Sequence, residues 1–172
     1  MRIVIPGGSG QIGTILARAF QSDGHDVVVL SRQPQIRPWR VVPWDGTTLD
    51  AWQGEIDGSG VVINLAGRTV NCRYNAANRH EILHSRIAST RVVGEAIAGA
   101  KRPPDIWLQA GTATIYAHRY DAPNDEQSGV LGGHESTRRA HGGSALMWRR
   151  RGSAHSTTQG RRRPGRCCSA LR

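Results

Sequence analysis

Short apolar runs recur along the first two thirds of the chain and predict strands. Continuous apolar centres of this kind are typical of strands that are covered on both faces. They lie at residues 1–6, 25–32, 59–67 and 105–117, the last running into a loop, and a shorter run at 40–42 predicts a further strand.

Between these runs the apolar side chains recur at helical spacing. The helical stretches cover residues 14–24, 49–56 and 76–100. The spaced side chains are Ile15, Leu16 and Phe20 in the first stretch and Ile82, Leu83, Ile87, Val92, Val93, Ala96 and Ile97 in the last. Strands that alternate with helices indicate a parallel sheet with right-handed crossovers, so we expect an α/β fold.

This organisation ends near Gly133. Residues 134–172 contain no Val, Ile, Phe or Tyr, and such a segment cannot bury enough apolar surface to offset its ordering entropy. The net charge of +10 is also concentrated there, with ten Arg against Glu135, whereas residues 1–133 carry 13 Lys and Arg against 12 Asp and Glu. We expect a folded domain over residues 1–133 and a disordered basic tail over 134–172. The tail has the composition of a GC-rich gene read out of frame, and a shifted frame is one hypothesis for it.

Composition excludes several classes of protein. No apolar run approaches the roughly 20 residues of a membrane span, and the three apolar residues between Arg2 and Pro6 are too few for a signal peptide. A cytoplasmic location is therefore expected. The three cysteines form neither a disulfide framework nor a C-x-x-C pair. Because the chain has one Phe, we expect aromatic packing to be sparse.

The segment IPGGSGQIG places Gly7, Gly10 and Gly13 between the first strand and the first helix. Glycine at this spacing permits a tight turn, a close approach of a diphosphate to the backbone, and close packing of the helix. Free N–H groups and the helix dipole favour negative charge at the amino end of the helix. The segment therefore predicts a dinucleotide site.

The second strand ends in Ser31 and Arg32, where an acidic residue would bond the ribose 2′-hydroxyl of NAD. A hydroxyl and a guanidinium instead suit a 2′-phosphate, through charge-assisted hydrogen bonds. NADP is the favoured cofactor, and NAD stays open.

The segment HEILH, from His80 to His84, matches the H-E-x-x-H pattern of zinc peptidases. A zinc site needs a third ligand held by the fold. The extended pattern would have Gly at position 87 and His at position 90, where this chain has Ile87 and Thr90. We expect no metal here and interpret both histidines as solvated positions on a helix.

These motifs together resemble the extended branch of the short-chain dehydrogenase/reductase superfamily, and more narrowly its bacterial epimerase-family proteins. The matching segments, in the family's order over residues 1–133, are IPGGSGQIG, VVLSR, WDG, VINLAG, SRIAST and GTATIYA. The resemblance implies a Rossmann-like doubly wound sheet, NAD(P) binding, and redox or epimerisation chemistry on a sugar-like or other hydroxylated substrate.

The resemblance also implies which residues line the cofactor. The pyrophosphate would be lined by Gly7, Gly10, Gln11, Ile12 and Gly13. The remaining contacts would be Ser31 and Arg32 at the adenosine ribose, Asp45 near the adenine, and Leu65, Ala66 and Gly67 beside the nicotinamide-side ribose.

For catalysis, Thr112 takes the place of the Ser or Thr that bonds the substrate oxygen, and Tyr116 matches a structural tyrosine. The superfamily's acid/base is the Tyr of Y-x-x-x-K. That motif is absent, because the only lysine is Lys101 and the last tyrosine is Tyr120.

Three functions remain open. The first is an oxidoreductase or epimerase of the short-chain type, active or inactive as this chain. The second is a module that binds or senses a dinucleotide without turnover. The third is nonspecific, salt-sensitive nucleic-acid binding through the arginines of the tail.

Overall fold

The computed structural model describes residues 1–111, 116–117, 119–120, 123–125 and 127–131. Its elements in chain order are β1 (Arg2–Pro6), α1 (Gln11–Ser22), β2 (Asp26–Ser31), β3 (Arg40–Pro43), α2 (Gln53–Ile56), β4 (Val61–Asn64), α3 (Ala76–Gly99) and β5 (Ile106–Gln109). Every helix and strand expected from the sequence is present. β2, β4 and β5 end earlier than the apolar runs that predicted them, because these runs continue into loops.

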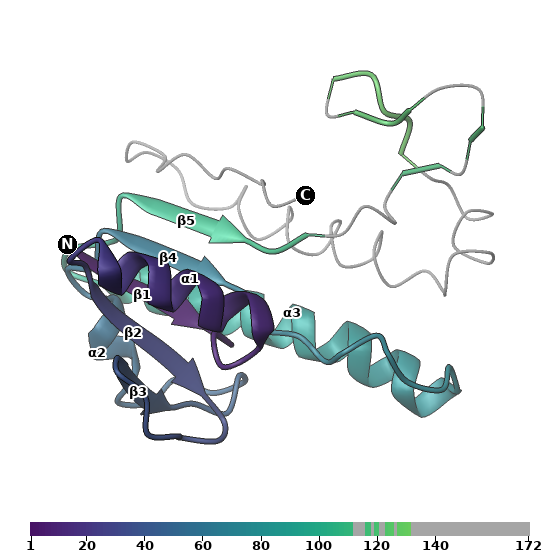
Figure 1. The fold of residues 1–172 in the computed structure, drawn as a ribbon. Helices are drawn as coiled ribbons and strands as arrows, with labels where there is room; N and C mark the ends of the chain where they lie inside the picture. The colour runs from purple at the N-terminus through teal and green to yellow at the C-terminus, as the bar shows by residue number, and fades with distance from the viewer. Residues whose placement is uncertain (112–115, 118, 121–122, 126, 132–172) are drawn as a thin grey trace.

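The strands form one parallel sheet in the order β3-β2-β1-β4-β5 (Figure 1). From β1 the chain moves outward through β2 to β3, then returns to place β4 on the other side of β1. The strand order therefore reverses between β1 and β4, at the point where doubly wound sheets bind ligands. The predicted α/β, Rossmann-like fold is confirmed.

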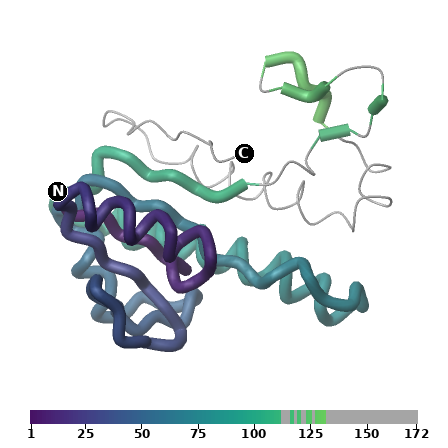
Figure 2. The backbone as a smooth tube through the Cα atoms, in the orientation of Figure 1, coloured from purple at the N-terminus to yellow at the C-terminus, as the bar shows by residue number. Residues whose placement is uncertain are grey.

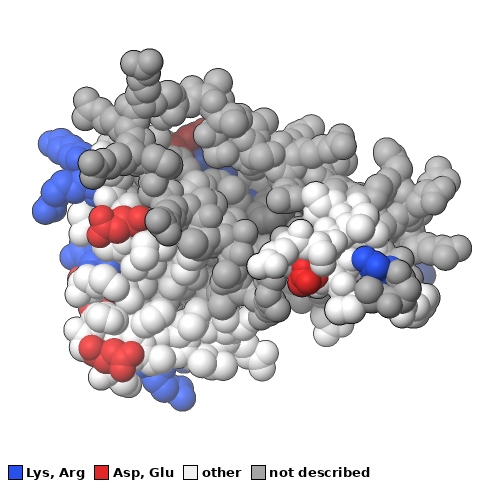
Figure 3. Space-filling model, turned by 90° about the horizontal axis from the view of Figure 1, so that it is seen from above, with Lys and Arg blue, Asp and Glu red and all other residues white. Residues whose placement is uncertain are grey.

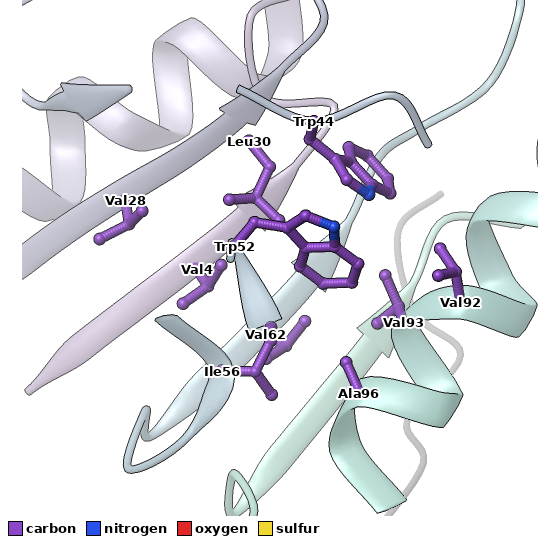
Figure 4. Packing of buried hydrophobic residues seen from close by; sticks show 10 residues of the cluster. All are labelled: Val4, Val28, Leu30, Trp44, Trp52, Ile56, Val62, Val92, Val93 and Ala96. Carbon is purple, nitrogen blue, oxygen red and sulfur yellow. The ribbon is translucent and has the colours of Figure 1, made fainter. Parts of the chain in front are cut away.

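Two apolar clusters cover the two faces of the sheet. Ile3 and Ile5 of β1 face α1, whereas Val4 between them faces α2 and α3. Figure 4 shows the second cluster, in which Val4, Val28 and Val62 line up across three strands beneath the helical side chains. Since successive residues of a strand point to opposite faces, burial on both faces produces the continuous apolar runs of the sequence.

The expectation of sparse aromatic packing is wrong. Trp39, Trp44 and Trp52 are buried, and the rings of Trp44 and Trp52 meet edge to face with centroids 5.6 Å apart. Trp52 also donates from Nε1 to the carbonyl oxygen of Thr48 at 3.0 Å. The chain uses tryptophan in place of phenylalanine, and Trp39 fills part of the α1 face beside the short connection between β2 and β3.

The helices differ in how much of their length is buried. In α1 the buried positions are the small residues Gly13 and Ala17, while Ile15 is 67% exposed despite its helical spacing with Leu16 and Phe20. In α3 most buried residues lie in the second half, and the first turns extend past the sheet (Figure 2). The loop after β4 runs out along these turns before α3 returns toward the sheet.

An ion-pair group ties the amino ends of the strands together. Glu55 of α2 is 8% exposed, and its Oε1 lies 2.6 Å from Nη2 of Arg40. Its Oε2 lies 3.6 Å from Nη1 of Arg2, whose Nε donates to Asp26 at 2.8 Å. Three strands and α2 are thus joined at the edge opposite the carboxyl ends.

In the part of the chain that the structure describes, no helix is long and apolar enough to cross a bilayer.

Candidate functional site

The loops that follow β1, β2 and β4 meet at the carboxyl edge of the sheet. The amide of Gly7 donates to the carbonyl of Leu30 at 2.9 Å, and the amide of Leu65 donates to the carbonyl of Pro6 at 2.9 Å. The loop after β1 is therefore held between the ends of β2 and β4. Most of the residues predicted to line a dinucleotide lie on these three loops.

Two of the three spaced glycines are required by close contacts. Gly7 has φ of +74°, and a Cβ there would lie 2.6 Å from the Cα of Ala66. A Cβ at Gly13 would lie 2.3 Å from the carbonyl oxygen of Gly8. No real side chain tolerates these distances, so the tight turn and the close helix packing predicted from the sequence are confirmed.

Gly10 differs from its two neighbours. Apart from its two chain neighbours, no residue comes within 4 Å of the position that its Cβ would take, and it is the N-cap of α1 with extended backbone. No side chain caps the helix there, and Gln11 and Ile12 in the first turn are exposed. The first amides of a helix have no partner within the helix, so this end presents N–H groups and positive potential at an open surface. Such a surface suits an anion.

Ser31 and Arg32, at the end of β2, differ in burial. The side chain of Ser31 is buried, and its hydroxyl both donates to the carbonyl and accepts from the amide of Gln33, at 3.1 and 3.2 Å. The serine therefore shapes the turn. Arg32 is exposed at the same edge, and its guanidinium is the charged group next to the end of β2.

Asp45 organises the turn after β3. Its carboxylate accepts from the amides of Thr47 and Thr48 at 2.8 and 2.9 Å, and from their hydroxyls at 2.9 and 2.6 Å. These bonds, above all the Thr48 hydroxyl, hold the pKa of the carboxyl well below its usual range. The four bonds all lie within its own turn, and the adenine contact implied for Asp45 stays a prediction.

The low pKa of Asp45 predicts a loss of stability in acid. Because the folded pKa lies below the unfolded value of about 3.9, the carboxylate stabilises the fold above that value, and the effect disappears as pH falls toward the folded pKa. We expect the melting temperature of the wild type to exceed that of Asp45→Asn at pH 7, with the difference shrinking below about pH 4. A Thr48→Val variant should shrink the same difference, since it removes the largest cause. A constant gap between wild type and Asp45→Asn at all pH values would contradict the assignment.

The loop after β4 carries the last group of predicted cofactor residues. Leu65 and Ala66 are half-buried and Gly67 is exposed. Two residues that sequence reasoning missed hold this loop: Asn64, fully buried, accepts from the amide of Ala66 at 3.0 Å, and its Nδ2 donates to Oε1 of Gln109 at 2.9 Å. The sequence signal that could have located them is an amide side chain at the end of an apolar run, Asn64 after one run and Gln109 after another.

Other predicted positions lie outside the described residues. These include Thr112 and the arginine-rich residues 134–172, so the catalytic, disorder, reading-frame and nucleic-acid hypotheses remain predictions. Tyr116 is described, and its ring lies so close to Gly129 that a Cβ there would meet the ring at 2.7 Å.

On the face seen in Figure 3, charged side chains of both signs are scattered, in keeping with the balanced charge of residues 1–133.

The HEILH segment lies in the projecting half of α3. His80 and His84 are exposed, with their rings stacked 5.7 Å apart. Across the described part of the chain, His, Cys, Asp and Glu form no group of three that could hold a metal ion. The interpretation of both histidines as solvated helix positions is confirmed by their exposure.

A parallel sheet with this strand order and a glycine loop at its switch point defines the Rossmann-like class of nucleotide-binding folds. Within that class the chain belongs to the NAD dependent epimerase/dehydratase family, whose model matches residues 3–144. It is 34% identical over 131 residues to the bovine epimerase family protein SDR39U1, covering 74% of this chain and 42% of that protein. It is also 32% identical over 114 residues to an epimerase family protein of Staphylococcus saprophyticus, covering 66% and 38% of the two chains.

Solved structures agree with this family. Human SDR39U1 with NADPH superimposes with a TM-score of 0.73 at 26% identity, over 94% of this chain and 50% of that one. MoeE5 in complex with UDP-glucose and NAD superimposes with a TM-score of 0.70 at 19% identity, over 91% and 50%, and shows the fold alone. The chain spans about half the length of the relatives that it matches.

Proposed function

We propose that the chain binds NADP at the carboxyl edge of its sheet and serves as the dinucleotide-binding part of a short-chain-type oxidoreductase or epimerase. The single observation that carries this proposal is the asymmetry of the glycine loop. Gly7 and Gly13 are packed against backbone, whereas Gly10 faces open space beside an uncapped helix end. A diphosphate held by main-chain amides needs this arrangement, because any side chain at the open position would keep it away.

With the diphosphate at this position, each of the other predicted residues would meet a different part of the dinucleotide. The amides of Gln11 and Ile12 would donate to the diphosphate, and Arg32 would contact the adenosine side. Residues 65–67 would lie beside the nicotinamide-side ribose. Ser31 and Asp45 would act by shaping their turns, since their polar atoms are bonded within them. Thr112 would bond the oxygen of a hydroxylated or sugar-like substrate.

The exposed guanidinium of Arg32 supports NADP over NAD. It stands at the end of β2, where the 2′-position of the adenosine ribose lies in this class of fold. The relative whose solved structure contains NADPH belongs to the same family.

Replacing Arg32 with alanine should therefore change cofactor preference. Loss of charge-assisted hydrogen bonds to a 2′-phosphate should weaken NADPH binding about tenfold or more and leave NADH binding unchanged. Calorimetric titration of both cofactors measures this. Arg37→Ala is the matched control, because Arg37 lies in the same loop but donates to Oε1 of Gln35 at 2.6 Å. Equal losses for NADPH and NADH in Arg32→Ala would place the 2′-phosphate elsewhere.

A non-catalytic dinucleotide-binding module is the second candidate. It is favoured by the absence of Y-x-x-x-K from this sequence, since Ile97 stands four residues before Lys101, the single lysine. Comparing NADPH binding with turnover separates the two candidates. Turnover is measured as NADPH oxidation with keto forms of sugar nucleotides or other carbonyl substrates, and as NADP⁺ reduction with the corresponding hydroxylated substrates. Binding without turnover supports the module, and turnover supports the enzyme.

A further inference from the structure

Two consecutive residues of α3 hold one residue of the loop that follows β4. The amide of Arg68 donates to Oγ of Ser85 at 2.9 Å, and its carbonyl accepts from Nη1 of Arg86 at 3.1 Å. The side chains of Ser85 and Arg86, seventeen and eighteen positions further along the chain, thus bind both main-chain polar groups of Arg68. Neither side chain belongs to the site as predicted from the sequence, although both lie in the SRIAST segment.

The guanidinium of Arg86 also covers Gly67. A Cβ on Gly67 would lie 3.1 Å from Cζ and 3.2 Å from Nε of Arg86, so the glycine permits this close approach. Nη1 of Arg86 makes a second bond, to the carbonyl of Ile82 at 2.9 Å, which fixes its orientation on α3. Burial lowers the pKa of Arg86, and a guanidinium nevertheless stays charged at neutral pH. A desolvated cation is costly, and here Nη1 donates both to the loop carbonyl of Arg68 and to the α3 carbonyl of Ile82.

The same loop is fixed from the sheet side. Leu65 donates to Pro6, and Ala66 donates to the side chain of Asn64. The segment is therefore bound to the sheet at Leu65 and Ala66 and to α3 at Arg68. Gly67 lies exposed between the two anchors, in the loop that leaves the carboxyl end of β4.

We propose that Ser85 and Arg86 are positioning residues that hold Gly67 and Arg68 in place for the nicotinamide half of the dinucleotide. This inference rests on the proposed function. The two side chains act on the ligand through the main chain of the loop, so their effect should be confined to the half of the ligand that this loop meets. The adenosine half lies over the ends of β2 and β3 and should not respond.

The test compares NADPH with 2′,5′-ADP, which carries the adenosine end and lacks the nicotinamide half. Both ligands are titrated calorimetrically into the full chain, with Ser85→Ala and Arg86→Met as variants and Arg86→Lys as the conservative one. Arg91→Met is the matched control, because Arg91 lies on the same helix in an exposed ion pair with Glu95 at 2.8 Å. Thermal melting of each variant reports on folding.

Ser85→Ala and Arg86→Met should each weaken NADPH binding about fivefold or more, with 2′,5′-ADP binding unchanged. Arg86→Lys should recover part of the loss, and Arg91→Met should bind both ligands as the wild type does. Unchanged NADPH affinity in both variants, or equal losses for NADPH and 2′,5′-ADP, would overturn the positioning role. A wild type that binds neither ligand would instead contradict the proposed function itself. If Arg86→Met fails to fold, Ser85→Ala carries the comparison.

Discussion

Gly13→Ala should destabilise the domain by about 3 kcal/mol or more, because the added Cβ meets backbone and has no space to move into. It would lie 2.3 Å from the carbonyl oxygen of Gly8 and 2.4 Å from its Cα. This clash is relieved only if α1 moves away from the loop after β1. Such a movement would disturb the apolar cluster on that face of the sheet, to which α1 contributes Ala17. Because a whole domain is stabilised by about 5–15 kcal/mol, this loss is a large fraction of the total stability.

Chemical denaturation measures this change as the free energy of unfolding. Gly99→Ala is the control: it lies at the end of α3 with no atom within 4 Å of the added Cβ. That variant should be neutral or more stable by up to about 1 kcal/mol, since alanine favours helix more than glycine does. Equal stability of Gly13→Ala and Gly99→Ala would show that the helix is not packed on the loop as described.

Gly10→Asp should abolish measurable NADPH binding while leaving the fold intact. Asp is a preferred N-cap residue, so the variant should keep or raise the stability of α1. The side chain enters the open space beside the helix end, where it excludes the diphosphate by bulk and repels it by charge. We expect a loss of affinity of about 100-fold or more, equivalent to about 2.7 kcal/mol.

Gly10→Ser separates the two causes in this experiment. Serine is also a good N-cap and fills part of the same space without a charge. Its NADPH affinity should fall between that of the wild type and that of Gly10→Asp. If Gly10→Asp binds NADPH as tightly as the wild type and remains folded, the diphosphate does not sit at the amino end of α1.

The layout of the fold could be predicted from the sequence because it depends on local patterns. Burial on both faces requires continuous apolar runs, and these located β1, β2 and β4. The helix predicted at residues 76–100 is observed at Ala76–Gly99, since the helical spacing of its apolar side chains is a local signal.

Contacts between distant residues could not be predicted. The bond between Asn64 and Gln109 depends on the pairing of β4 with β5, and the bonds of Ser85 and Arg86 to Arg68 depend on how α3 returns along the loop. Helical spacing also misplaced Ile15, which is exposed. The buried positions of α1 are the small residues Gly13 and Ala17, and a pattern of large apolar side chains does not reveal them.

The extent of the domain remains a proposal. The family model matches as far as residue 144, past the boundary predicted at Gly133. We propose that the arginine-rich segment 134–172 is a shifted reading frame, on the basis of its sudden loss of Val, Ile, Phe and Tyr. Resequencing the gene tests this, and downstream frames that encode no further strands or helices of the family would refute it.

The central claim is that main-chain amides at the amino end of α1 hold a diphosphate. Amide chemical shifts in a ¹⁵N-labelled full chain, followed by NMR as NADPH is added, test it most directly. We expect the largest shifts on the amides of Gly10, Gln11 and Ile12, and we expect ADP to reproduce them. Saturable binding that leaves these three amides unmoved would contradict it.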